Sequence, residues 1–484
     1  MSTPLSIIIV GASGDLTSRK LVPALYGLYR KGRLPAEARI VGVSRSDFTA
    51  DSFRQHLAKE FREIAPKEFD SAKWEKFAPL IEYVRGDAAD PTKLQALVDW
   101  LKKREGGQPA NRLYYLSVAP ELYERIANSL AAVGLNKEDG GFRRVVIEKP
   151  FGRNLATAVA LNHALHRNWE ESQIYRIDHY MGKETVQNIL VLRFANLFFE
   201  PLWNRRYIDH VQITVAEKLD VGRRGPTYES IGVLRDIFQN HLLQILTLVA
   251  MEPATRFDAV SLRNEKLKVL EAVAVPNVQE ACINVSVGQY IGYRQTDGVA
   301  RDSHIPTFAA IRLDIDNWRW QGVPFYLRSG KALKERRSDV VIQFRPPPHL
   351  MFKLTPGEML ANNRLVLRIQ PDEGIQLHFE SKDPEVPEGM LLHNSTMQFS
   401  FATEYGAGAI PEAYERLLLD AVNGDATLFM RYDEIERAWA ILDPLIAAVE
   451  QADAAPPQQY EPHTWGPACA DEMLKRDGRE WQND

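Results

Sequence analysis

LSIIIVGASGDL, residues 5–16, is the stretch that decides the fold class of this chain. Residues 5–10 are nearly all apolar, which is expected of a strand that is covered on both faces. The small residues that follow allow a tight turn into a helix, and they let the backbone approach a pyrophosphate at the helix N-terminus. Because the turn is not G-x-G-x-x-G, a purely structural turn stays open as the alternative.

Similar apolar runs recur along the first third of the chain, separated by segments long enough for helices. They cover residues 40–43, 81–84, 113–118, 145–147 and 174–177. Short buried strands that alternate with helices are typical of a doubly wound parallel sheet. We therefore predict that residues 1–178 form a Rossmann-like α/β domain.

The pattern changes after residue 205, where apolar and polar residues alternate within each run. The alternating runs cover residues 210–216, 282–290, 308–315, 340–344, 365–369, 375–379 and 397–401. Such alternation is typical of half-exposed strands in a mostly antiparallel sheet. Helical patterns interrupt these runs near residues 228–251, 258–272, 411–422 and 433–451. We predict that residues 179–484 form a large α+β domain with one broad, mostly antiparallel sheet.

Length and composition exclude several classes of protein. A chain of 484 residues exceeds what one hydrophobic core usually supports, so two domains are expected. A net charge of −5 gives no general affinity for nucleic acid or for anionic membranes. No apolar run predicts a membrane span, and residues 1–5 lack a signal-peptide pattern. Cys282 and Cys469 supply neither a disulfide framework nor metal-ligand spacing, so we expect a cytoplasmic protein.

The densest group of reactive side chains lies in RIDHYMGKE, residues 176–184. This segment places a carboxylate, an imidazole, a phenol and an ammonium at the junction between a short strand and a helix. Such groups are costly to desolvate unless they are paired, so the junction is typical of a site for a polar, anionic substrate. A solvated, hydrogen-bonded turn is the alternative.

Three other segments carry candidate site residues. EKPFG, residues 148–152, ends the fifth predicted strand at the edge where open α/β sheets bind ligands, and its X-Pro bond is a candidate for the cis isomer. A helical segment carries a polar band on an otherwise apolar pattern, formed by Asp236, Asn240, His241 and Gln244. Residues 328–337 are basic in an acidic chain. A satisfied core histidine and a solvated charge run are the alternatives for the last two.

The choice of cofactor is indicated at the end of the second predicted strand. An NAD site usually has a carboxylate there, whereas the 2′-phosphate of NADP needs a cation. This chain has Ser44 and Arg45 at that point, and a guanidinium can bind a phosphate with two donors. The sequence therefore favours NADP. Asp47 leaves NAD open as a secondary acceptor, and a solvated loop arginine is the alternative for Arg45.

Several strings, in this order along the chain, resemble those of the glucose-6-phosphate dehydrogenases. They are GASGDLTSRK (11–20), EKPFG (148–152), RIDHYMGKE (176–184), QNH (239–241) and RSGK (328–331). Met181 stands where the family usually has leucine. The shorter EKP also marks sugar dehydrogenases that resemble glucose–fructose oxidoreductase, but these do not normally carry RIDHY-x-GKE. That family is the main alternative, and a non-catalytic NADP-binding sensor is another.

The resemblance implies an enzyme that oxidises C1 of glucose 6-phosphate to 6-phosphogluconolactone and passes hydride to NADP without a metal. It implies that His241 is the general base and Asp178 its orienting partner. The substrate-binding residues it implies are Lys149, His179, Tyr180, Lys183, Glu217, Asp236, Lys331 and Arg336. The cofactor-binding residues it implies are Gly11, Ala12, Ser13, Gly14, Asp15, Leu16, Arg45, Asp87 and Lys149.

Two further expectations follow from the resemblance. Arg336 stands where the family has a second lysine, which keeps the charge but changes the reach and geometry of the contact. The broad sheet of the second domain resembles the surface through which the family forms dimers, so we expect a homodimer or homotetramer.

Overall fold

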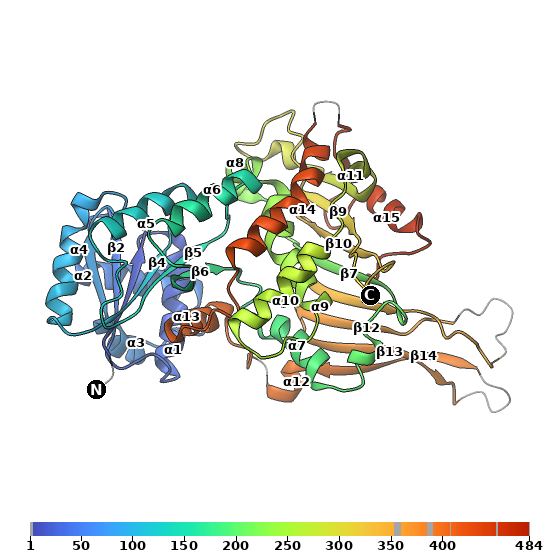
Figure 1. Cartoon of the computed structure of the whole chain (residues 1–484), viewed down its shortest axis with the longest axis horizontal. Helices are drawn as coiled ribbons and strands as arrows, with labels where there is room; N and C mark the ends of the chain where they lie inside the picture. The colour runs from blue at the N-terminus through green and yellow to red at the C-terminus, as the bar shows by residue number, and fades with distance from the viewer. Residues whose placement is uncertain (1–2, 353–359, 385–390, 407, 452–453, 484) are drawn as a thin grey trace. The chain divides into compact units, whose positions relative to one another are not determined.

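The computed structural model describes residues 3–352, 360–384, 391–406, 408–451 and 454–483 (Figure 1). The chain separates into two compact units. Unit 1 contains Met1–Gly182, Arg256–Arg263 and Pro411–Glu436, and unit 2 contains Lys183–Thr255, Asn264–Ile410 and Arg437–Asp484. None of the helices in the described part of the chain combines the length and the apolar character that crossing a bilayer requires.

The centre of unit 1 is a parallel sheet. Its described strands are β1 (Leu5–Val10), β2 (Ala38–Ser44), β3 (Ile81–Arg85), β4 (Asn111–Leu116), β5 (Arg143–Glu148) and β6 (Ile174–Ile177). They pair in parallel in the order β3-β2-β1-β4-β5-β6, the order of dinucleotide-binding Rossmann folds. Every residue of β1 is buried, as a strand covered on both faces requires. The predicted Rossmann-like sheet is confirmed.

Helices cover both faces of this sheet. They include α1 (Val22–Arg30), α2 (Ala50–Ile64), α3 (Ser71–Phe77), α4 (Gln95–Glu105), α5 (Tyr123–Ala132) and α6 (Leu155–His166). Figure 1 shows α5 and α6 along one face and α1 and α3 along the other. Side chains fix where some of them begin: Thr49 caps α2 and Asn154 caps α6, each by accepting a hydrogen bond from a backbone N–H three residues on.

A segment near the C-terminus belongs to unit 1. It contains α13 (Ala413–Asn423), which packs against α1. Lys31 lies 2.5 Å from the Glu415 carboxylate, and Arg144 on β5 donates to the carbonyl oxygens of Ala421 and Val422 at 2.8 and 2.7 Å. The sequence pattern predicts a helix here, but it does not predict that the helix joins the N-terminal fold.

The centre of unit 2 is a broad mixed sheet. In the described residues its order is β14-β13-β12-β11-β7-β10-β9-β8-β15. The bounds are β7 (Ile208–Ala216), β8 (Val285–Tyr290), β9 (Phe308–Leu313), β10 (Phe325–Gly330), β11 (Arg337–Phe344), β12 (Arg364–Gln370), β13 (Gly374–Lys382), β14 (Leu392–Ser400) and β15 (Gln458–Tyr460). The β7–β10 and β8–β15 pairs are parallel, and the other pairs are antiparallel. The predicted broad, mostly antiparallel sheet is confirmed.

The helices of the C-terminal half correct two predicted strand boundaries. Residues 282–284, predicted as part of a strand, belong to α11 (Val278–Asn284), because Asn277 and Glu280 form a reciprocal capping box that starts a helix. Phe401 likewise begins α12 (Phe401–Tyr405), which Ser400 caps. The other principal helices are α7 (Glu184–Ala195), α8 (Gly225–Glu229), η8 (Leu234–Leu242), α9 (Leu243–Ala250), α10 (Ala259–Ala272), α14 (Tyr432–Glu450) and α15 (Ala468–Lys475).

Candidate active site

The turn after β1 has the geometry that a pyrophosphate site needs. Gly11 has a φ of +83°, and a Cβ atom there would lie 2.2 Å from the carbonyl oxygen of Ser117, so only glycine fits. The backbone N–H groups of Gly11 and Ala12 donate to the carbonyl oxygen of Val43 at 2.8 and 3.2 Å. Residues 13–15 are exposed just before the helical segment that begins at Thr17. Small exposed residues at a helix N-terminus suit a dinucleotide phosphate.

The end of β2 lies beside this turn. The Ser46 hydroxyl donates to the Ser13 hydroxyl at 3.0 Å, which joins the loop of Arg45 to the glycine turn. Arg45 itself is exposed. The Asp47 carboxylate accepts a hydrogen bond from Arg85 at 3.0 Å. The Asp47 carboxylate, which the sequence analysis weighed as an NAD feature, is therefore paired with Arg85.

The remaining predicted cofactor contacts follow β3 and β5. Asp87 caps its own turn by accepting from the backbone N–H of Ala89 at 3.1 Å. Lys149 is half-buried directly after β5, and its peptide bond to Pro150 is cis, as the sequence suggested. Glu148 precedes it and is half-buried beside tyrosine side chains, and desolvation of its carboxyl raises the pKa to about 6.

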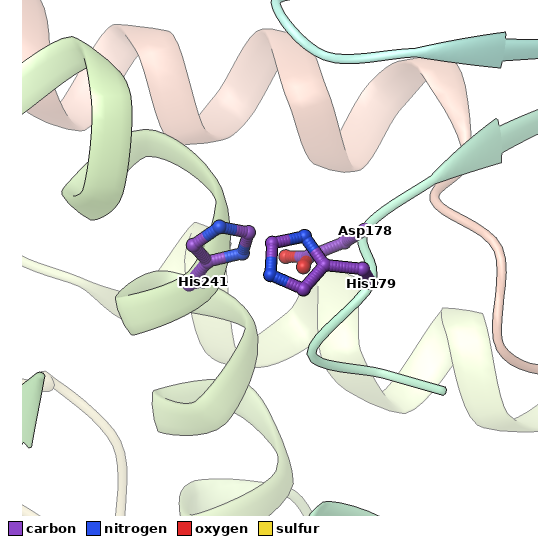
Figure 2. A group of neighbouring side chains, drawn as sticks. All are labelled: Asp178, His179 and His241. Atoms are coloured by element: carbon purple, nitrogen blue, oxygen red, sulfur yellow. The ribbon is translucent and has the colours of Figure 1, made fainter. Parts of the chain in front are cut away.

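The turn that follows β6, residues 178–182 and called the signature turn below, holds buried reactive groups in unit 1. Asp178 is 1% exposed, and its Oδ1 atom accepts from the backbone N–H of Tyr180 at 2.9 Å. His179 is half-buried and Tyr180 is buried. Figure 2 shows Asp178 and His179 on the loop that follows the strand β6. A Cβ atom at Gly182 would lie 2.7 Å from the carbonyl oxygen of Ala413, so this turn fits against α13 only with glycine.

His241 belongs to unit 2, where it lies on the helix η8 (Figure 2). It is 1% exposed, and its backbone N–H donates to the Asn240 side chain at 2.7 Å. The predicted polar band continues with Gln244, which is fully buried. Within the described residues neither polar atom of the Gln244 side chain has a hydrogen-bond partner. Buried polar groups normally find partners, so this helix face suits a polar ligand better than a plain core.

Three predicted substrate residues meet at the ends of two central strands of the unit 2 sheet. Lys331 follows β10 and Glu217 follows β7, and these strands are parallel neighbours in register. The Lys331 Nζ atom lies 2.6 Å from Glu217 Oε2 and 3.6 Å from Asp236 Oδ2. The lysine side chain is only 2% exposed. An ammonium between two carboxylates gives both donors and acceptors for a sugar phosphate.

The two other cations that the sequence predicts in unit 2 share a single partner. The Lys183 ammonium donates to Gln370 Oε1 at 2.8 Å, and the Arg336 guanidinium donates to the same oxygen at 3.1 Å. Gln370 ends β12, which pairs with β11 beside Arg336. Its amide nitrogen donates to the Ser338 hydroxyl at 3.0 Å, which orients the oxygen toward the cations. Lys183 and Arg336 therefore form one cationic group.

Comparison with known proteins gives consistent matches along the whole chain. The model of the glucose-6-phosphate dehydrogenase NAD binding domain matches residues 8–188, and the model of that enzyme's C-terminal domain matches residues 190–482. A glucose-6-phosphate 1-dehydrogenase from Aggregatibacter actinomycetemcomitans is 44% identical over 492 residues, which cover 98% of this chain and 97% of that relative. The chain belongs to the glucose-6-phosphate dehydrogenase family.

Solved structures of glucose-6-phosphate dehydrogenases have the same fold. One is described as the enzyme in complex with its substrate glucose 6-phosphate. Its sequence is 35% identical to this chain. The alignment covers all of this chain and 99% of that one, and the TM-score is 0.91. Another, from Mycobacterium avium, is also 35% identical over the same coverage, with a TM-score of 0.87. The resemblance is confirmed, and the chain is an oxidoreductase of this family rather than a member of the alternative sugar dehydrogenases.

Gln370 is the site residue that the sequence analysis missed in this glucose-6-phosphate dehydrogenase family member. A polar residue that ends a strand and precedes proline is one weak signal that could have identified it. Its contact with Lys183 spans 187 positions in the chain, so only the folded sheet reveals it. The site residues that the sequence predicts are divided between the two units. Those in unit 1 are Gly11–Leu16, Arg45, Asp87, Lys149 and Asp178–Tyr180. Those in unit 2 are Lys183, Glu217, Asp236, His241, Lys331 and Arg336.

Proposed function

We propose that this protein is a glucose-6-phosphate 1-dehydrogenase that oxidises C1 of D-glucose 6-phosphate to 6-phospho-D-glucono-1,5-lactone with hydride transfer to NADP. This reaction is the first step of the oxidative pentose phosphate pathway. The observation that carries the proposal is the full-length match to the substrate-bound relative, at a TM-score of 0.91. Residues 1–178 serve as the NADP-binding domain, and residues 179–484 bind the substrate and form the oligomer.

In this proposal His241 takes the proton from the C1 hydroxyl as hydride leaves the carbon. Imidazole titrates in the range that suits a general base near neutral pH. Asp178 orients the ring and stabilises the imidazolium that forms. The burial of both side chains supports these roles, because buried ionisable groups in a family of known enzymes mark functional sites. NADP supplies the hydride acceptor, so the residues need only bind, orient and move a proton.

Substrate recognition divides between the phosphate and the sugar. His179, Tyr180, Lys183, Lys331 and Arg336 provide donors and positive charge for the phosphate. Glu217 and Asp236 accept hydrogen bonds from sugar hydroxyls, and Lys149 reaches both the sugar and the nicotinamide. The ion pairs of Lys331 with Glu217 and Asp236 support this arrangement, because they couple the anion site to the hydroxyl acceptors.

The cofactor is NADP, with NAD as a secondary acceptor. The turn from Gly11 to Leu16 suits a pyrophosphate because residues 13–15 are exposed at the start of a helix and no side chain has room at Gly11. Asp87 lines the same crevice. Arg45 binds the 2′-phosphate, and the engagement of Asp47 by Arg85 supports the preference for the phosphorylated dinucleotide. No metal takes part in this scheme.

The active form is a homodimer or homotetramer in the cytoplasm. The broad sheet of unit 2 supports the assembly, since its edge strand β14 exposes the Met397 side chain, which is 62% exposed, among polar residues.

Initial rates of nicotinamide reduction test the proposal and separate it from the alternatives. Glucose 6-phosphate with NADP is expected to give fast turnover, NAD slower turnover, and free glucose a much lower kcat/KM. Lys183→Met should raise KM for glucose 6-phosphate at least tenfold and leave free glucose nearly unchanged. Equal rates with glucose and its phosphate would favour the alternative sugar dehydrogenases. NADP binding without turnover of any sugar would favour a sensor.

A further inference from the structure

Three tyrosine hydroxyls converge on Glu148, the residue directly before Lys149. The Tyr115 hydroxyl on β4 donates to the Glu148 carboxylate, and Tyr414 on α13 hydrogen-bonds the same carboxylate. The Tyr123 hydroxyl on α5 donates to the Glu148 carbonyl oxygen at 2.9 Å. All of these residues belong to unit 1.

Desolvating the hydroxyl and carboxylate groups of this cluster costs free energy unless each of them has a hydrogen-bond partner. Tyr115, Tyr123 and Tyr414 are 0%, 1% and 7% exposed, and buried phenols need hydrogen-bond partners. The charged groups that act on the carboxylate are the Lys149 ammonium, which favours its ionised form, and Asp178, which opposes it. Glu148 itself is half-buried, and a carboxylate that takes its partners from buried phenols is more typical of a functional contact than of a packing contact.

The helix α13 contacts two predicted active-site segments within unit 1. Tyr414 reaches Glu148 at the end of β5, and the preceding residue, Ala413, lies against Gly182 of the signature turn. The ion pair with Lys31, just after α1, and the hydrogen bonds from the Arg144 side chain on β5 hold this helix to the unit. The start of α13 therefore links the segment of Lys149 to the segment of Asp178.

We propose that Glu148 is a positioning residue for Lys149, and that Tyr115 and Tyr414 hold its carboxylate so that α13 sets the place of the lysine ammonium. Tyr123 completes the arrangement, because its bond to the Glu148 carbonyl oxygen fixes the peptide that joins the two residues. The inference rests on the proposed function in one respect: Lys149 must act on substrate or cofactor.

Steady-state kinetics of Glu148→Gln, Tyr115→Phe and Tyr414→Phe test this role. Each is expected to lower kcat/KM for glucose 6-phosphate about tenfold, because small displacements of a contacting group have large kinetic effects. Tyr114→Phe is the matched control. Tyr114 is the neighbouring fully buried tyrosine on β4, it faces the other side of the sheet, and its hydroxyl donates to the Leu135 carbonyl oxygen at 2.9 Å. It should lose as much thermal stability as Tyr115→Phe while keeping wild-type kcat/KM.

A second set in a Lys149→Met background separates positioning from folding. Once the ammonium is gone, Glu148→Gln and Tyr414→Phe should change the remaining kcat/KM by less than twofold. A full additional loss in that background, or wild-type kinetics for the single variants, would overturn the inference. The two phenylalanine variants decide the matter if Glu148→Gln does not fold. An active Lys149→Met enzyme would instead contradict the role of Lys149 in the proposed function.

Discussion

Lys331 and Glu217 form an ion pair of 2.6 Å at one end of two parallel strands, and the lysine side chain is almost fully buried. The residues are 114 positions apart in the chain, and the register of β7 with β10 brings them together. Asp236 supplies a second carboxylate at 3.6 Å. A buried charge held in this way serves as a preorganised group, because the fold has already met the cost of desolvating it.

Lys331→Met should destabilise the protein as well as weaken substrate binding. The change leaves two carboxylates without their cation, so the free energy of unfolding should fall by about 1–3 kcal/mol in urea denaturation. Adding Glu217→Gln should restore part of this loss, since one unpaired charge is then removed. Lys334→Met, at an exposed position three residues on, is the control. A loss no greater than that of the control would show that the pair contributes nothing to stability.

Arg45→Ala should remove the preference for NADP. Loss of a guanidinium that binds the 2′-phosphate should raise KM for NADP tenfold or more, about 1.4 kcal/mol. NAD has no 2′-phosphate, so its KM serves as the internal control and should change little. Initial rates with each cofactor measure both constants. Equal losses with the two cofactors would mean that Arg45 serves the loop rather than the phosphate.

Local sequence patterns predict much of this fold. The apolar runs from Leu5 to Ile177 identify the parallel strands, because burial on both faces leaves a continuous apolar signal. The error at residues 282–284 has a local cause as well: the capping pair Asn277 and Glu280 outweighs an alternating pattern.

Long-range packing accounts for what the sequence analysis did not predict. The attachment of α13 to the N-terminal unit and the three tyrosines around Glu148 join segments that are far apart in the chain. Gln370 is similar, because it becomes a partner of Lys183 and Arg336 only through strand register. The spacing of apolar residues along the chain does not predict contacts between segments that are far apart in sequence. The strings shared with the family predict individual site residues such as His241. That His241 is buried is known only from the folded chain.

Glu148 should make the stability of the protein depend on pH. The pKa of this carboxyl is raised from its ordinary value of 4.5 to about 6, chiefly by burial. The folded state then holds its proton to higher pH than the unfolded state, so this contribution to stability is complete below about pH 4.5 and is lost as pH rises through about 6. Relative to Glu148→Gln, the wild type should lose up to about 2 kcal/mol across this window. Urea unfolding at several pH values measures the difference, and a constant difference would contradict the account.

His241→Asn and Asp178→Asn should both lower turnover and leave substrate affinity largely intact. Losing a positioned base typically costs ~10²–10⁴-fold in rate, and an amide in place of Asp178 cannot stabilise an imidazolium. Rapid-mixing kinetics of the single and double variants, with a direct binding measurement for glucose 6-phosphate, report the two effects. The double variant should lose less than the product of the single losses, because the residues act as a unit. Full multiplication would mean that they act separately.

A glucose 6-phosphate that carries deuterium at C1 shows directly whether hydride passes from C1 to NADP. Mass spectrometry of the reduced cofactor after turnover measures where the label goes. NADPH should carry the deuterium, and turnover of the labelled substrate should be slower wherever hydride transfer limits the rate. Unlabelled NADPH, with the deuterium retained in the sugar product or released to water, would contradict this transfer.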